Sequence, residues 1–310
     1  MANSLGTLNG SLILQRALAL TFTQRPLLKM ISKGFRELDG NVDNALLGQS
    51  VVSRVKSVQS VNAFGTGPGN VSDTDVPVTL SAHKEVHVAF GPAEYNATNR
   101  DLIEEAAQPI AVAIANHIID SISDLWSVAN FGAGVSVAAA NWNYSGLMLA
   151  LRKAMATAGV SPENRFCVLN SDAYNALLAD PIIVAALNNP LNQNAIAEGK
   201  LPKIAGIQLD EYPSLGTNAT GQTTDKRIGF AGHPESTVFV ARAPKGPGEI
   251  INSLNFPGVI DYVEDPTTGF RVMVNQWVDP TTLVVNNRVS WLQGFAKGNA
   301  TQGILVRNTI

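Results

Sequence analysis

The sequence predicts an α+β fold that combines a long exposed β-hairpin, a helix long enough to act as a spine, and strands on both sides of that helix. Two blocks rich in β-branched residues, 48–56 and 76–80, enclose a glycine- and proline-rich segment that is typical of a hairpin tip. Apolar residues recur at helical spacing from Arg100 to Trp126. Because strand patterns return after Phe239, we expect one domain to be built from two separate parts of the chain.

The composition predicts a protein whose surface is covered by copies of itself. Charged residues number 47 of 310, or 15%, whereas an ordinary soluble domain has about 25%. A surface so poor in charge needs cover from a membrane or from other protein. The best apolar run, Ala106 to Ile119, contains Pro109, Asn116 and His117 and does not read as a spanning helix. We therefore expect other copies, and no membrane, to provide the cover.

Three further features of the composition exclude classes of protein. The segment Met1 to Leu20 lacks the basic start of a signal peptide, which predicts a protein kept in the cytoplasm. The net charge of −3 does not suit binding to duplex DNA by phosphate neutralisation. The single cysteine, Cys167, excludes an internal disulfide framework and a thiolate zinc cluster within one chain.

The first 85 residues are interpreted as two extended parts. Residues 1–47 form a weakly amphipathic segment followed by Pro26 and glycines, and we expect an arm outside the core. Residues 48–85 form the hairpin. An isolated two-stranded ribbon is marginal in water and cannot bury both of its faces on its own domain. We therefore expect the hairpin to lie on a neighbouring copy.

The spine helix follows a half-buried strand in which Val86, Val88 and Phe90 alternate with polar residues. From Arg100 to Trp126 the helix would extend about 40 Å at 1.5 Å per residue. Glu104 and Glu105 lie near its start, where the helix dipole favours acidic side chains or where they would meet an arginine of a neighbour.

The remainder of the chain is divided into a compact α/β domain, 141–237, and a discontinuous domain, 86–140 with 238–310. The uncharged stretch Leu125 to Leu151 is interpreted as a buried or interfacial loop. A helix that ends at Gly159 and a strand at 165–169 follow, and Asn170 offers a capping side chain for the next helix.

The sequence presents no assembled catalytic, cofactor or metal site. His83 and His87 lie four residues apart in a strand, about 13 Å from each other. Asp73 and Asp75 lack the glycine and the distal glutamate of a calcium loop. The alternative that stays open is a small-molecule enzyme with a sparse site around Cys167 or His117. The main hypothesis is a structural protein that is not an enzyme and needs no cofactor.

The order of these segments resembles the major capsid protein family of tailed bacteriophages, and podovirus-type coat proteins in particular; encapsulin shells share this fold. The residues that carry the resemblance are short motifs in a characteristic order: 48–51, 86–88, 102–119, 159–169, 203–207, 269–277, 287–289 and 298–306. In that family they correspond to the extended hairpin or E-loop, the peripheral domain with its spine helix, and the A-domain. Residues 210–237 leave room only for a loop, whereas some relatives carry an inserted β-domain there.

The resemblance implies a major capsid protein that forms the pentamers and hexamers of an icosahedral head around double-stranded DNA. It also implies a scaffolding protein and a portal as partners, assembly in the cytoplasm of a bacterial host, and a final location in the virion. An encapsulin that stores a cargo enzyme is the alternative within the same fold. We expect residues of the hairpin and of the start of the spine helix to contact neighbouring copies: Arg54, Lys56, Phe64, Asp73, Asp75, Arg100, Glu104 and Glu105.

Overall fold

The computed structural model describes residues 10–24, 32–33, 46–55, 64, 74–97, 102–187, 201, 203–216, 226–245, 259–265 and 269–309. The helices are α1 (Gly10–Gln24), α3 (Pro92–Ala97), α4 (Leu102–Ser123), α5 (Val128–Phe131), α6 (Leu149–Thr157), α7 (Ser171–Leu178) and α8 (Pro181–Leu187). Short 3-10 turns are η3 (Ala139–Asn141), η5 (Pro213–Gly216), η6 (Pro234–Ser236) and η7 (Ala300–Gln302), and η4 (Tyr144–Met148) is a π-helical turn.

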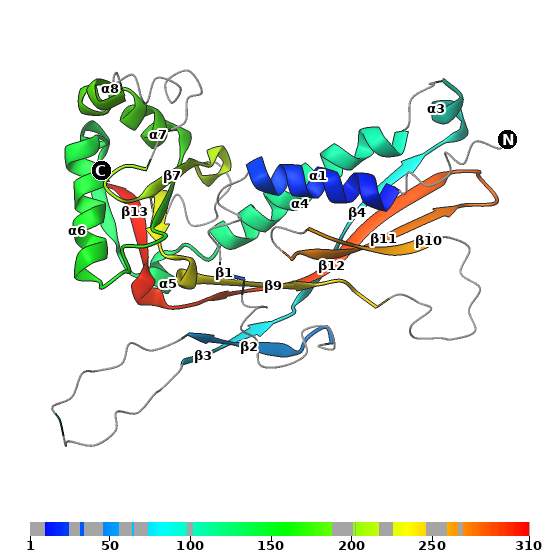
Figure 1. Ribbon diagram of the computed structural model, residues 1–310, viewed down its shortest axis with the longest axis horizontal. Coiled ribbons are helices and arrows are strands. Elements are labelled where there is room, and N and C mark those ends of the chain that lie inside the picture. Colours follow the sequence, from blue (N-terminus) through cyan, green and yellow to red (C-terminus); the bar gives the residue numbers. More distant parts are fainter. Residues whose placement is uncertain are drawn as a thin grey trace.

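The strands form two larger sheets and one two-stranded ribbon, which Figure 1 shows as three parts of an elongated molecule. The strands are β1 (Ser32–Lys33), β2 (Ser50–Val55), β3 (Thr74–Thr79), β4 (Ala82–Phe90), β5 (Val135–Ala138), β6 (Phe166–Leu169), β7 (Gln208–Glu211), β8 (Arg227–Gly232), β9 (Thr237–Arg242), β10 (Val259–Glu264), β11 (Arg271–Val278), β12 (Val285–Lys297) and β13 (Gly303–Thr309). The mixed helix and strand content confirms the predicted α+β class.

The six-stranded sheet has the order β1-β9-β12-β11-β10, and β4 pairs with β12 as well. The predicted alternation in β4 is confirmed, because Val86 and Val88 are half-buried against the main core while His87 and Ala89 are exposed. Helices α1 and α4 lie on one side of this sheet, and β2 and β3 lie on the other (Figure 1).

The predicted spine helix is α4, and its apolar stripe is the centre of the main core. Ile110, Ile114, Ile118 and Ile122 recur every four residues and are at most 2% exposed. The helix has 22 residues, which corresponds to about 33 Å. It ends at Ser123, earlier than the sequence indicated. After the helix, backbone hydrogen bonds of the 3-10 type continue to Trp126, whose amide donates to the Ser123 carbonyl.

The expectation that the N-terminal segment stays outside the core is wrong for α1. Leu14 and Leu18 are buried in the main core with α4, and Gln15 Nε2 donates to the Glu264 carbonyl of β10 at 3.0 Å. The weak amphipathic pattern was misleading because a helix that lies across both a helix and a sheet edge needs only a narrow apolar stripe.

The five-stranded sheet has the order β5-β13-β8-β6-β7 and contains the predicted strand at 165–169 as β6. Gly159 follows α6 in the left-handed region, with φ +72°, as a helix-ending glycine does. The side chain of Asn170 accepts from the Ala173 amide at 3.0 Å, so the predicted cap of α7 is confirmed. Residues of β6 and β8 are buried on both faces of the sheet.

Three sequence-based assignments in this region need correction. The stretch Leu125 to Leu151 contains α5, β5, η3 and η4 rather than a loop. The stretch 210–237 contains β8, a central strand of the sheet, so it is more than a loop. The last strand, β13, pairs with β8 and β5 instead of joining the discontinuous domain proposed for 238–310. Glycines in β8 lowered its strand signal, although they are needed where the backbones of neighbouring elements approach closely.

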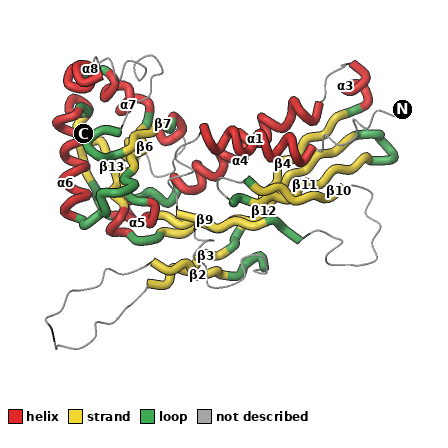
Figure 2. The backbone as a smooth tube through the Cα atoms, viewed as in Figure 1, coloured by secondary structure: helices red, strands yellow, loops and turns green. Residues whose placement is uncertain are grey.

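The end of α4 joins the two larger sheets. Arg227 of β8 is buried, and its Nη1 donates to the carbonyls of Ser123 and of Trp126, the latter at 2.7 Å. Ser123 is the last residue of α4 and Trp126 follows it closely, so a cation at this position matches the helix dipole. The Trp126 ring stacks on Phe230 with 4.7 Å between centroids. Figure 2 shows the junction between the two groups of strands.

Two acidic side chains, Asp120 and Asp124, lie close to the same junction. Tyr212, which follows β7, donates its hydroxyl to Asp120 Oδ1 at 2.6 Å. Burial raises the pKa of Asp124, with Arg227 opposing that rise and Asp120 adding to it. The helix end is therefore held by charge-assisted bonds as well as by aromatic packing.

We expect Arg227→Met to lower the free energy of unfolding by about 3 kcal/mol, because it leaves buried carbonyls without a charged donor. Urea unfolding followed by circular dichroism measures the change. Arg152→Met is the matched control, since Arg152 is exposed on α6, and a surface change of that kind stays within about 0.5 kcal/mol. Equal effects of the two variants would contradict the role given to Arg227.

Candidate assembly interface

The predicted hairpin is present in its two strands. Strands β2 and β3 pair antiparallel, from Ser50 opposite Thr79 to Val55 opposite Thr74. At the base, the Gly48 amide donates to the Leu80 carbonyl at 2.9 Å and the Leu80 amide donates to the Gln49 carbonyl at 3.0 Å. The segment between the strands, apart from Phe64, lies outside the described residues. The paired strands form a ribbon separate from the larger sheets (Figure 2).

The two faces of the ribbon differ in burial. Val51, Val78 and Leu80 are buried on one face, where they pack with Val238 and Val240 of β9. The other face carries exposed Ser50, Pro77 and Thr79, and the Ser50 and Thr79 hydroxyls are 2.8 Å apart. The base of the hairpin is therefore anchored on its own sheet, and one face remains available for contact with another molecule.

Gly294 of β12 allows this anchoring. A Cβ atom built at this position would lie 2.3 Å from the Thr79 carbonyl oxygen and 3.2 Å from Val78 Cγ1. Real Cβ atoms do not approach a backbone oxygen so closely, so any larger residue at this position would push β3 away from β12. Backbone proximity, not an unusual φ angle, requires glycine here.

The predicted contact residues occupy two separate parts of the molecule. On the hairpin, Arg54 of β2 is in register with Asp75 of β3, which is exposed. Phe64 is fully exposed, at 109% of the reference area. Glu104 and Glu105 belong to the first turns of α4, at the far end from the two-sheet junction, and Glu105 is exposed (Figure 1).

The other three predicted contact residues, Lys56, Asp73 and Arg100, lie outside the described residues.

Exposed apolar residues that the sequence reasoning did not select occur as neighbours at two turns. Leu46 and Leu47, each 55% exposed, precede the hairpin base. Val278, the last residue of β11, and Leu283, in the turn between β11 and β12, are also exposed. That turn is held by Asp279, whose carboxylate accepts from the Thr281 amide at 2.9 Å and the Thr282 hydroxyl at 2.8 Å. Apolar residues directly beside turn residues were the available signal in the sequence.

The hydrogen bonds of that turn alter the titration of Asp279. Donation from the Thr281 amide and the Thr282 hydroxyl lowers the pKa of the carboxyl. The group therefore stays ionised and keeps accepting these bonds over the ordinary pH range. The turn accordingly presents Val278 and Leu283 on a locally fixed backbone.

The groups considered for an enzyme site belong to packed parts of the fold. The Cys167 side chain is completely buried in the core of the five-stranded sheet, and desolvation raises the pKa of its thiol. His117 contacts Gln293 at 2.8 Å and the edge of the Trp291 ring. Burial lowers the pKa of His117, Lys84 lowers it further, and Asp120 opposes both. Neither environment favours a nucleophile or a general base.

The other polar motifs also have structural settings. His83 and His87 lie in β4, and His87 stacks on Trp277 with 5.5 Å between centroids. Among the residues that the structure describes, no group of three or more histidine, cysteine or acidic side chains is arranged to hold a metal ion. Within the same residues, no helix is both long and apolar enough to cross a membrane.

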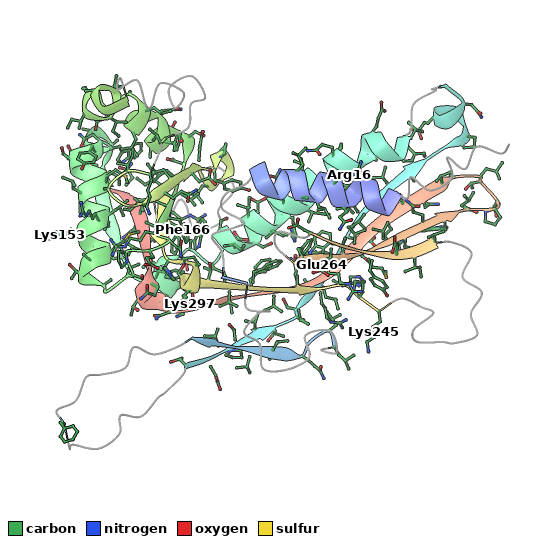
Figure 3. The ribbon with its side chains drawn as sticks, in the orientation of Figure 1. Arg16, Lys153, Phe166, Lys245, Glu264 and Lys297 are labelled. Atoms are coloured by element: carbon green, nitrogen blue, oxygen red, sulfur yellow. The ribbon has the colours of Figure 1, made fainter. Side chains whose placement is uncertain are left out.

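Charged side chains on the rims of the molecule point outward. Lys153 on α6 and Arg16 on α1 lie on outer surfaces in Figure 3, whereas Phe166 lies inside the five-stranded sheet region. The hairpin, the turns and the outer helix faces are therefore the exposed surfaces, whereas the buried aromatic residues stabilise the fold.

Comparison with known proteins gives a likeness in structure. No protein-family model matches the chain, and no curated protein matches it. A solved structure from Mycobacterium phage Che8 is similar with a TM-score of 0.56 and 14% identity, over 89% of each chain. The capsid structure of cyanophage P-SCSP1u is similar with a TM-score of 0.54 and 15% identity, over 84% of each chain. At this identity the likeness is one of fold, and it extends over most of the chain.

We expect Gly294→Ala to lower the free energy of unfolding by about 1–3 kcal/mol, because the added methyl group overlaps the β3 backbone. Urea unfolding measures this, and limited proteolysis should cut the hairpin faster. Gly91→Ala is the control, because its Cβ would meet nothing closer than Glu94 Oε2 at 3.9 Å. A Gly294→Ala variant as stable and as protease-resistant as the control would contradict the anchoring.

Proposed function

We propose that this chain, which has the fold of a tailed-phage major capsid protein, is itself a major capsid protein that self-assembles into an icosahedral shell. The observation that carries the proposal is the likeness to the P-SCSP1u capsid structure over 84% of both chains. Coverage of that extent takes in most of the chain, so the likeness does not rest on one common motif.

The surface of the subunit supports assembly. Only 15% of the residues are charged, and the ribbon of β2 and β3 keeps one face exposed. In a closed shell each copy receives the extended parts of its neighbours, and such heterologous contacts repeat around pentamers and hexamers. The charge deficit then follows from the area that neighbours cover.

We assign the parts of the subunit to roles that follow the family resemblance. The five-stranded sheet with α6 and α7 would meet its copies at the centres of pentamers and hexamers. The six-stranded sheet with α4 would form the periphery, and the hairpin would lie on a neighbour. The assembly contacts proposed from the sequence stay Arg54, Lys56, Phe64, Asp73, Asp75, Arg100, Glu104 and Glu105.

The partners of the shell are part of the proposal. A scaffolding protein and a portal would direct assembly in the cytoplasm of the bacterial host, and the mature head in the virion would enclose double-stranded DNA. The net charge of −3 suits this role, because a wall that neutralised phosphates would hold DNA strongly and hinder its movement during filling.

Electron microscopy of the purified chain, with and without a scaffolding protein, tests the proposal. We expect uniform closed shells, with nuclease-protected double-stranded DNA in particles isolated from infected cells. Shells that contain a cargo enzyme and no genome would indicate an encapsulin. A monomer or dimer under both conditions, with saturable binding of a small molecule, would overturn the shell function in favour of an enzyme.

Replacing Ala63 to Asp73 by a short turn should leave a soluble, folded subunit and block shell closure, because the reaching part of the hairpin is removed. Size-exclusion chromatography, circular dichroism and electron microscopy measure these outcomes. In a control variant, the same segment is replaced by glycine and serine at unchanged length. This control shows whether the length of the hairpin or its side-chain contacts are needed for closure. Normal particles from the shortened variant would contradict the role of the hairpin.

A further inference from the structure

Two strands at outer edges of the larger sheets contain an aspartate where a strand former would be expected. Among the strands that the structure describes, β7 ends the five-stranded sheet and β10 ends the six-stranded sheet. An edge strand presents unpaired main-chain groups, onto which a strand of another copy can add. A charge-poor chain that gathers at high local concentration is especially exposed to such pairing. Aspartate is depleted in strands, yet Asp210 and Asp261 occupy these edges.

In β10, the Asp261 carboxylate accepts a hydrogen bond from a backbone amide that faces away from the sheet. The Asp265 amide donates to the Phe270 carbonyl at the β11 end of the pair. Amides alternate between the two sides of a strand, so the amide of Tyr262 points away from β11. Asp261 Oδ1 accepts from that amide at 2.8 Å. Beside it, the Glu264 carbonyl accepts from Gln15 Nε2 of α1, near the Glu264 label in Figure 3.

The same arrangement recurs in β7. The Gln208 amide donates to the Arg165 carbonyl, and the Tyr212 amide donates to the Leu169 carbonyl, both on the β6 side. The amide of Glu211 therefore points outward, and Asp210 Oδ1 accepts from it at 3.1 Å. The two edges are unrelated in sequence and belong to different sheets, one paired parallel and the other antiparallel.

We infer that Asp210 and Asp261 close the two sheet edges to strand addition by a second copy of the chain. Each carboxylate accepts from an outward amide that an incoming strand would otherwise pair with. Contacts between copies then use side-chain surfaces and the hairpin, while the sheets of neighbouring subunits stay separate. The inference concerns the folded subunit and does not depend on whether the shell encloses DNA.

Alanine and asparagine variants at both positions test the inference. Asp→Ala removes the acceptor, whereas Asp→Asn keeps an acceptor oxygen and removes the charge. Peptide-resolved hydrogen exchange on full-length subunits, kept at a concentration below assembly, reports on 208–211 and 259–264. We expect exchange in these peptides to rise about fivefold in Asp210→Ala and Asp261→Ala, and to stay near the original rate in the asparagine variants.

Association measures the consequence for pairing. The doubly substituted Asp210→Ala, Asp261→Ala chain should form thioflavin-positive aggregates faster than the double asparagine variant. A second substitution keeps the test decisive if alanine destabilises the fold: Glu211→Pro added to Asp210→Ala removes the outward N–H itself and should suppress aggregation through β7. Unfolding midpoints of all variants show whether aggregation follows edge exposure or loss of stability.

Several results would overturn the inference. Equal aggregation of the alanine and asparagine variants would assign the effect to charge, not to the hydrogen bond. Unchanged exchange in Asp210→Ala and Asp261→Ala would show that the carboxylates do not protect the amides. Aggregation that persists after Glu211→Pro would locate the pairing elsewhere. None of these results bears on shell formation, which electron microscopy tests separately.

Discussion

The apolar stripe of α4 is the constraint on which the rest of the molecule depends. Ile110, Ile114, Ile118 and Ile122 face the six-stranded sheet side of one continuous core, and Trp126 just beyond the helix carries that core to Phe230 of the other sheet. Because one helix serves both sheets, neither sheet can shift without disturbing the other.

The junction at the end of α4 explains how a long helix can stop inside the protein. The Ser123 carbonyl at the end of the helix and the Trp126 carbonyl just beyond it are both acceptors for Arg227, which supplies a charged donor inside the protein. The chain also passes between the two sheets twice, from β8 to β9 and from β12 to β13. The two sheets are therefore tied by several segments far apart in the sequence, and the domains are not consecutive parts of the chain.

The hairpin shows how an extended element is made compatible with a stable subunit. Its base contributes Val51 and Val78 to a small core with β9, so the reaching segment starts from a fixed platform. The close approach of β3 to β12 at Gly294 sets that platform against the sheet. One face of the ribbon is consequently buried against its own subunit, and the other face stays exposed.

The sequence by itself determined the parts whose signal is local: the hairpin strands, the spine helix with its four-residue spacing, the alternation in β4 and the cap at Asn170. Tertiary structure alone decided the place of β8 and β13 in the sheet, because both strands pair with partners that are distant in the sequence. It likewise decided that α1 joins the core through Leu14 and Leu18, since a narrow apolar stripe is buried only when a partner surface matches it.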